Sequence, residues 1–283
     1  MVIQFMRLQK VFMFKTLIIS TVITGLCGFA SCAESISAHP PVDTNKAPVV
    51  SASSPQVENI LDGLQKAAAG LKSYQCNVEY LFSQPILESK TLRTGDLLYA
   101  RFGNGLPAGA GSKLRINFNT LTQDDGPQQN YKDYYIFDGL WLTHIDYQIK
   151  QVQKRQLAEA EEPIDAFELA KRNFPIIGFG KSEDLNKQFD VNLAGDSNGL
   201  THLQLKVKPD SQYADQYKSV DIWINPGAPG LPSKIEAVST EGDIYNIMFI
   251  DPKINLTINE KAFEFTIPAD FGKPEIIPLK KQD

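Results

Sequence analysis

The sequence is poor in the residues from which most catalytic and metal sites are built. Its 283 residues include three cysteines and three histidines. No cysteine pair is present at zinc-ligand spacing, and neither His39, His144 nor His202 has a neighbour at such a spacing. The usual zinc arrangements are therefore excluded, and we expect no metal, no cofactor and no catalytic residue.

Motifs of nucleotide binding and nucleophilic catalysis are also lacking. Gly180-Lys181-Ser182 resembles the end of a phosphate-binding loop, but Pro175 stands where the first glycine is required and has no N–H to donate. No Gly-x-Ser-x-Gly elbow occurs. The chain is therefore expected not to be an enzyme.

Disulfides are not expected to hold the fold. Two of the three cysteines, Cys27 and Cys32, lie near the N-terminus, which leaves Cys76 alone in the remainder. Cys76 stands on the apolar side of a strict alternation from Tyr74 to Tyr80, which predicts a buried thiol in a strand.

A cluster of basic residues is missing as well. The formal net charge is −5, and the first 33 residues hold three of the 28 basic side chains and no acid. The rest therefore carries 25 basic against 33 acidic residues, a net charge of −8. This balance argues against nucleic acid or an anionic membrane surface as a partner.

The N-terminus has the pattern of a secretory signal peptide over residues 1–33. Basic residues precede an apolar core, Thr16–Leu26, which is shorter than the roughly 20 residues of a membrane span. Ser31-Cys32-Ala33 predicts cleavage before Glu34, whereas Phe29-Ala30-Ser31-Cys32 resembles a bacterial lipobox and would leave a lipid on Cys32. Both alternatives predict an exported protein.

Residues 34–56 are rich in Ser, Pro and Ala and predict a disordered tether, which precedes a single domain over residues 57–283. Ser54-Pro55 is typical of a helix start, and apolar residues recur at helical spacing up to Gly70. A second helix is expected over 158–173 and a short one at 182–186. The rest predicts antiparallel strands at 74–82, 91–101, 113–119, 189–193, 200–207, 219–225, 233–239, 243–251 and 263–267.

The stretch Tyr131–Leu157 has the strongest hairpin pattern. Asp138-Gly139 is typical of a two-residue turn, which would pair Phe137 with Leu140 and Tyr135 with Leu142. Both faces of this hairpin would be apolar. The sheet therefore needs cover on both sides or a cavity that holds something apolar.

Five segments resemble the LolA/LolB superfamily of periplasmic lipoprotein carriers, in the form of outer-membrane lipoprotein-sorting proteins. They are LQKAAAGLKSYQCNVEY (64–80), GDLLYAR (95–101), FDGLWLTHIDYQIKQ (137–151), IEAVSTEGDIY (235–245) and FEFTIPADF (263–271). The resemblance implies an unclosed antiparallel β-barrel of 11 strands, with helices as a lid over an apolar cavity for acyl chains. It also implies that Arg101 ties the lid to the barrel, although Phe102 stands where the family usually has proline.

On this resemblance we expect an envelope carrier or acceptor of lipoproteins or lipids, a monomer exported to the periplasm of a Gram-negative-type bacterium. An inner-membrane release complex and an outer-membrane receptor are the implied partners. The alternative is a tethered module that senses or docks a protein partner without transporting lipid. The expected cavity residues, each equally compatible with plain core, are Tyr80, Phe82, Leu98, Tyr135, Phe137, Leu140 and Leu142.

Overall fold

The structure is a computed structural model that describes residues 54–103, 111–166, 182–197, 199–225 and 230–279. The expected signal peptide, Cys32 and nearly all of the expected tether lie outside these residues. No helix within the described ranges is both long enough and apolar enough to cross a membrane.

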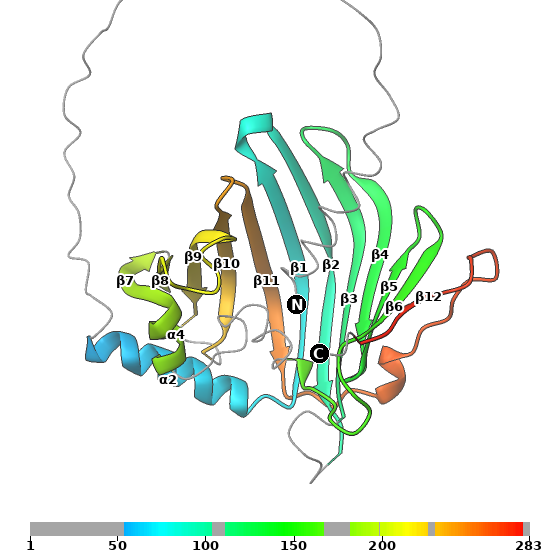
Figure 1. Cartoon of the computed structure of the whole chain (residues 1–283), viewed down its shortest axis with the longest axis horizontal. Helices are drawn as coiled ribbons and strands as arrows, with labels where there is room; N and C mark the ends of the chain where they lie inside the picture. Colours follow the sequence, from blue (N-terminus) through cyan, green and yellow to red (C-terminus); the bar gives the residue numbers. More distant parts are fainter. Residues whose placement is uncertain (1–53, 104–110, 167–181, 198, 226–229, 280–283) are drawn as a thin grey trace, which may run out of the picture.

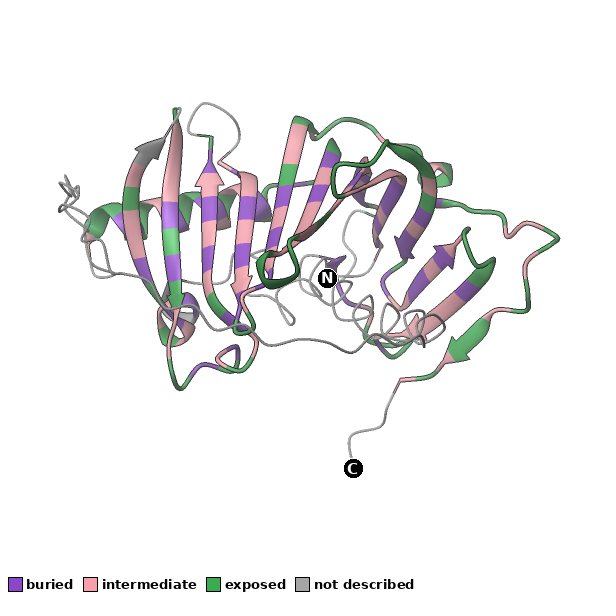
Figure 2. Cartoon of the chain, turned by 90° about the horizontal axis from the view of Figure 1, so that it is seen from above, coloured by how far each residue is buried: buried purple, intermediate pink, exposed green. Residues whose placement is uncertain are grey.

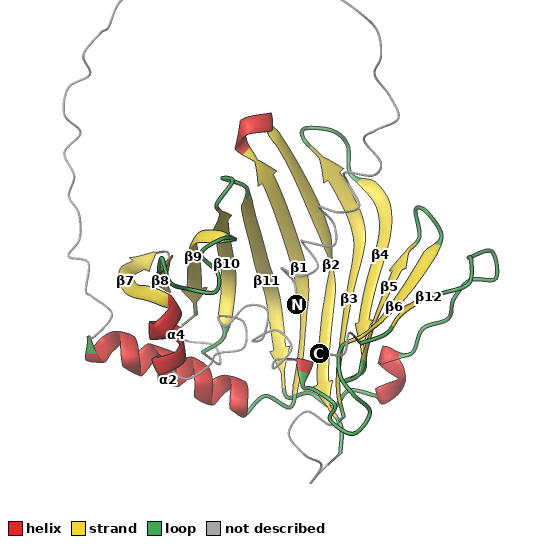
Figure 3. Cartoon of the chain, viewed as in Figure 1, coloured by secondary structure: helices red, strands yellow, loops and turns green. Residues whose placement is uncertain are grey.

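The described chain forms one sheet of twelve strands with few helices (Figures 1 and 3). The strand order is β12-β6-β5-β4-β3-β2-β1-β11-β10-β9-β8-β7. The strands are β1 (Ser73–Gln84), β2 (Ser89–Arg101), β3 (Ser112–Gln123), β4 (Gln129–Phe137), β5 (Trp141–Asp146), β6 (Gln151–Gln156), β7 (Phe189–Ser197), β8 (Leu200–Val207), β9 (Tyr217–Ile224), β10 (Pro232–Ser239), β11 (Ile244–Ile254) and β12 (Glu275–Ile277).

The sheet is not closed, because β12 and β7 are its two edges. This confirms the mainly β, unclosed class. Two expected details differ: the sheet has twelve strands, and its β12–β6 pair is parallel while the other pairs are antiparallel.

One long helix, α2 (Pro55–Ala69), packs on one face of the sheet, which we call the inner face. Its start is the predicted one, since the Ser54 hydroxyl accepts a hydrogen bond from the N–H of Val57. The helix contacts β7 and the short helix α4 (Ser182–Gln188). Figure 1 shows α2 running beneath β7 to β11 toward the lower end of β1.

The two faces of the sheet bury separate apolar clusters, and Figure 2 shows buried residues alternating with less buried ones along the central strands. The inner cluster combines α2 with side chains from ten strands. The outer face carries a smaller cluster around Ile136, Ile145 and Val152, against which Ile267 and Phe271 pack. The predicted need for cover on both faces is thus met by α2 inside and the C-terminal segment outside.

The C-terminal segment differs from the prediction. Phe263–Ile267 is not a strand, because residues 260–263 form a 3-10 helix, η2 (Glu260–Phe263), capped by the Asn259 side chain. The last strand is instead β12, which adds to the edge of β6.

The central hairpin has a different register from the predicted one. Phe137 pairs with Leu142 and Tyr135 with His144, a slip of two residues. The turn is wider because the Asp138 carboxylate accepts hydrogen bonds from the N–H groups of Leu140 and Trp141. A slip of two keeps every side chain on its face, so the predicted faces of the paired positions survive.

The helix expected over 158–173 does not begin at residue 158. Residues 158–165 form turns and loop, and a proline at 163 cannot lie inside a helix without breaking it. Residues 167–181 lie outside the described ranges.

A bulge between β2 and β3 shapes the middle of the sheet. The register shifts at Thr94/Gly95 on β2, and a Cβ at Gly95 would overlap the carbonyl oxygen of Asn117. Only glycine fits at this close approach of two backbones.

Candidate ligand-binding site

The inner face carries most of the residues that were expected to line the cavity. Four of the expected cavity residues, Tyr80, Tyr135, Phe137 and Leu142, are buried in its cluster, and Phe82 and Leu140 pack against it partly buried. Phe137 is 1% exposed and Tyr80 5%. The inner face is therefore closely covered by the chain itself in this structure.

Leu98 does not belong to this set. Leu97 and Tyr99 pair with Cys76 and Tyr74 on the inner face, whereas Leu98 pairs with Gln75 on the outer face. The expectation that Leu98 lines the same surface is wrong, because neighbouring residues of a strand point to opposite faces.

Arg101 is the point where three elements meet. Its Nε donates to Oδ2 of Asp165 over 3.0 Å, and its Nη1 donates to the carbonyl oxygen of Ala69 at the end of α2 over 3.4 Å. The Tyr99 hydroxyl donates to the same Asp165 oxygen over 3.0 Å. Burial first, and then the Asp165 charge, raises the pKa of Tyr99, so this phenol stays a donor.

The segment 158–166 is fastened to the sheet at two further points. The N–H of Ile164 donates to the carbonyl of Gly139 in the hairpin turn, and the N–H of Ala166 donates to the Ser112 hydroxyl on β3. Arg101 therefore ties both α2 and this segment to the end of β2.

A second polar group lies on the inner face and was missed by the sequence analysis. Arg93, Asp133 and His144 come from β2, β4 and β5. Oδ2 of Asp133 accepts from Arg93 Nη1 over 3.2 Å and from the Tyr135 hydroxyl over 3.1 Å. Its Oδ1 lies 2.6 Å from Nε2 of His144. No signal in the sequence joins these residues, because only the strand order and the bulge at Gly95 do so.

The inner face is hollowed where α2 passes the edge of the sheet. A cleft of about 580 Å³ lies between the N-terminal half of α2 and strands β7 and β8. Its lining is mixed, with Ile60 and Leu193 beside Gln56, Asn59 and Thr201. A cleft of this size is within the range of small-ligand sites.

Comparison with known proteins gives one family. Residues 127–266 match the family described as "Outer membrane lipoprotein carrier protein LolA". No curated protein matches the chain in sequence.

Several solved structures are similar to the chain at low identity. An uncharacterized conserved protein from Thermus thermophilus has a TM-score of 0.44 at 14% identity, over 79% of this chain and 99% of that one. The lipoprotein LppX of Mycobacterium tuberculosis has a TM-score of 0.41 at 12% identity, over 73% and 99%. A chain of the MucA/MucB complex of Pseudomonas aeruginosa has a TM-score of 0.41 at 16% identity, and the match covers 74% of this chain and 60% of that one.

The matched residues run from before β4 to beyond η2 and so contain the central hairpin, the segment 158–166 and strands β7 to β11. Two of the five segments that carry the resemblance, 137–151 and 235–245, lie wholly within them, and a third, 263–271, begins within them; the other two lie before them, in the end of α2 with β1 and in β2. The chain is thus similar to the LolA family over residues 127–266.

Proposed function

We propose that the chain is a cell-envelope carrier or acceptor of lipoproteins or lipids, which buries acyl chains reversibly against the inner face. The observation that carries the proposal is the family match together with one apolar cluster that runs across ten strands. Burial of an acyl chain contributes about 0.8 kcal/mol per methylene. Such a surface therefore holds a chain that water rejects, and no catalytic step is needed.

Entry of a ligand requires movement, since the inner side chains are already buried. Among the described residues, α2 and the segment 158–166 contribute to this cover, and Arg101 is bonded to both. In this proposal Arg101 closes the site, and the cleft beside β7 and β8 is where α2 begins to part from the sheet. The proposal includes export to the periplasm and leaves the two forms of the N-terminus, free or lipidated at Cys32, to mass spectrometry.

A disulfide tests whether α2 is the moving part. A Cβ at Gly230 would lie 3.7 Å from the Cβ of Ala67 on α2, a separation that suits a disulfide. Gly230 has a φ of 68°, so a cysteine at this position strains the backbone. The reduced form of the same variant carries the same strain without the disulfide and is therefore the control.

The experiment is titration of a fluorescent acyl probe into the A67C/G230C variant, oxidised and reduced, with native mass spectrometry in parallel. We expect saturable probe binding to the wild-type and reduced proteins, displacement by a lipopeptide, and at least tenfold slower uptake by the oxidised form. Equal uptake rates would remove α2 from the entry path. No probe binding to any form would overturn the acyl-binding proposal.

The second candidate is a module that docks a protein partner without carrying lipid. The close packing of the inner face favours it, since Phe189 and Leu203 are fully buried and Tyr99 is 1% exposed. A wild-type protein that purifies without lipid and ignores the probe would put this function first. A diacylated Cys32 in the mature protein would exclude a free shuttle and leave acceptor or docking roles.

A further inference from the structure

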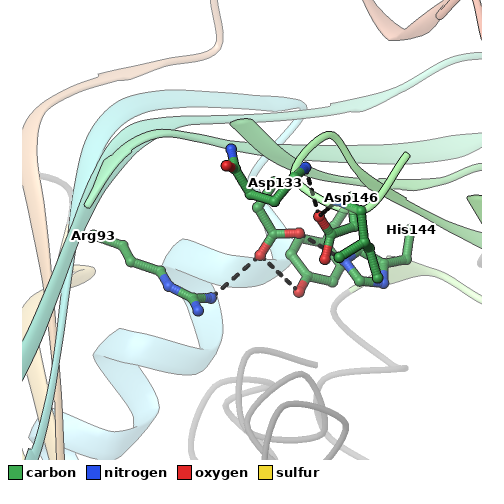
Figure 4. Close-up of polar contacts among 7 residues, drawn as sticks. Arg93, Asp133, His144 and Asp146 are labelled. Carbon is green, nitrogen blue, oxygen red and sulfur yellow. Dashed lines mark hydrogen bonds and ion pairs between the residues drawn. The ribbon is translucent and has the colours of Figure 1, made fainter. Parts of the chain in front are cut away.

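Three side chains of metal-ligand type meet on the inner face of the β4–β5 hairpin. Asp133 on β4 lies directly opposite Asp146 on β5, and His144 is two residues before Asp146 on the same face of that strand. Their nearest ligand atoms all lie within 4.8 Å of one another. Figure 4 shows these three side chains together, with Arg93 reaching Asp133 from β2.

The charge of this group favours a cation. Two carboxylates opposite each other across a strand pair repel, and such like-charge pairs destabilise a sheet. Arg93 compensates one of them, at 3.2 Å from Asp133, and leaves a formal charge of −1 with His144 neutral. An anionic ligand would meet a net negative site.

The hydrogen bonds around Asp133 prepare one oxygen for a ligand bond. Arg93 and the Tyr135 hydroxyl both donate to Oδ2, while Oδ1 faces His144. Asp133 is 2% exposed, so its orientation is fixed by these donors. Donors of this kind orient ligating carboxylates in metal sites.

His144 stacks on Tyr135. Its ring lies 4.4 Å from that of Tyr135, with an angle of 4° between the planes. Asp146 is anchored at the turn that follows β5, where its Oδ1 accepts from the N–H groups of Gln148 and Ile149. His144 and Asp146 are both half-buried, so an ion can reach them from solvent.

We propose that Asp133, His144 and Asp146 form a binding site for a divalent transition metal ion of the Zn²⁺ class. Nε2 of His144 and one carboxylate oxygen from each aspartate are its protein ligands. One nitrogen and two oxygens suit Zn²⁺ and its first-row neighbours better than Ca²⁺ or Mg²⁺. Tetrahedral ligand distances of about 2.0–2.2 Å require the 2.6 Å contact between His144 and Asp133 to widen by about 0.7 Å. Three protein ligands leave a fourth position for water or a ligand oxygen.

The chain contains a matched control for this site. His202 on β8 also lies 2.7 Å from an aspartate oxygen, that of Asp221, and stacks on Trp223 at 4.4 Å. Among the described residues this second pair has no third ligand, since only the group around Asp133 brings three together. His144 thus has a second carboxylate beside it, that of Asp146, and His202 has only that of Asp221 among the described residues.

Isothermal titration with Zn²⁺ on the purified, chelator-treated protein tests the proposal, with bound metal counted by elemental mass spectrometry. The variants are His144→Ala, Asp146→Asn and His202→Ala. Asp146→Asn keeps a side-chain oxygen that accepts from the N–H groups of Gln148 and Ile149 and removes the negative charge of the carboxylate. Circular dichroism establishes that each variant is folded.

We expect one equivalent of Zn²⁺ per wild-type chain, with affinity at least tenfold weaker in His144→Ala and Asp146→Asn and unchanged in His202→Ala. Absence of saturable one-to-one binding would overturn the proposal, as would an equal loss in His202→Ala. In that case His144 and Asp133 are a hydrogen-bonded pair and nothing more. The result does not depend on acyl binding, so it stands or falls apart from the proposed function.

Discussion

Nε of Arg101, at the end of β2, lies 3.0 Å from Oδ2 of Asp165, in the segment that follows β6. Asp165 is 3% exposed, whereas the Arg101 side chain is 37% exposed. The buried carboxylate thus depends on an arginine that solvent can reach. A contact of this kind opens more readily than one sealed inside the core, which fits a closing role for Arg101.

The first prediction concerns Arg101→Leu. The variant removes the donors to Asp165 and Ala69 and keeps the hydrogen bond from the Tyr99 hydroxyl to Asp165. Because the pair is partly exposed, we expect a loss of about 1 kcal/mol, or roughly fivefold faster release of an acyl probe. Stopped-flow fluorescence measures the release rate.

Arg115→Leu is the matched control for that measurement. Arg115 lies on β3 and donates to the carbonyl of Ala262 over 2.8 Å, also a backbone contact to another segment, but on the outer face. Its removal is expected to leave probe release unchanged. Equal rates in the two variants, whether fast or slow, would show that Arg101 has no special part in closure.

The second prediction concerns two glycines with opposite surroundings. Gly95→Ala would place a Cβ against the backbone of Asn117 and force the bulge between β2 and β3 to rearrange. We expect a loss of more than about 2 kcal/mol in the free energy of unfolding. Gly63, inside α2, has nothing within 4 Å of such a Cβ, so Gly63→Ala is expected to stabilise by about 0.5–1 kcal/mol. Urea unfolding measures both, and a tolerated Gly95→Ala would contradict the need for the bulge.

Sequence patterns located most of the elements but not the way they combine. Alternation around Cys76 predicted β1, and Ser54-Pro55 predicted the start of α2, because both are local signals. The hairpin register was missed, since the Asp138 side chain stabilises a wider turn that competes with the Asp-Gly turn. β12 was missed because its three residues pair in parallel with a strand more than 100 residues away.

The two candidate sites also differ in whether local sequence signals mark them. Arg101 was reached through a motif whose residues are contiguous; the structure adds its contacts with Asp165 and Ala69, and its role in tying a lid stays a prediction. The group around Asp133 joins three strands across a bulge, so no spacing in the sequence marks it. The expectation of no metal site was based on the spacing of ligand residues along the sequence. That spacing does not reveal a histidine and two aspartates that meet only when the two strands of a hairpin pair.

The third prediction is a loss of stability at alkaline pH. Burial, with smaller contributions from neighbouring charges, raises the pKa of Cys76 from 9.0 to about 12 and that of Tyr131 from 10.0 to about 12. Between the ordinary and the raised values the folded state holds more protons than the unfolded state. The free energy of unfolding therefore falls as the pH rises through this window, and the stabilising contribution is complete below pH 9.

Urea unfolding between pH 8 and 11 tests this sign. We expect the unfolding midpoint to fall steadily above pH 9, and Tyr131→Phe to fall less steeply because one of the titrating groups is gone. Stability that stays level or rises over this range would contradict the burial of these groups. The Cys76 thiol is likewise expected to react with a thiol reagent at pH 8 only after unfolding.

The fourth prediction concerns the C-terminal segment on the outer face. The ring of Phe271 lies 5.2 Å from that of Tyr147 and packs on the cluster that contains Ile145, which is fully buried. Phe271→Ala removes this cover and is expected to lower the free energy of unfolding by about 1–3 kcal/mol. Phe265, in the same segment, is 36% exposed and does not join the cluster. Phe265→Ala is therefore expected to cost less than about 0.5 kcal/mol. If the two variants unfold at the same urea concentration, the outer cluster does not depend on Phe271, and the sheet would have to be stable with that face open to water.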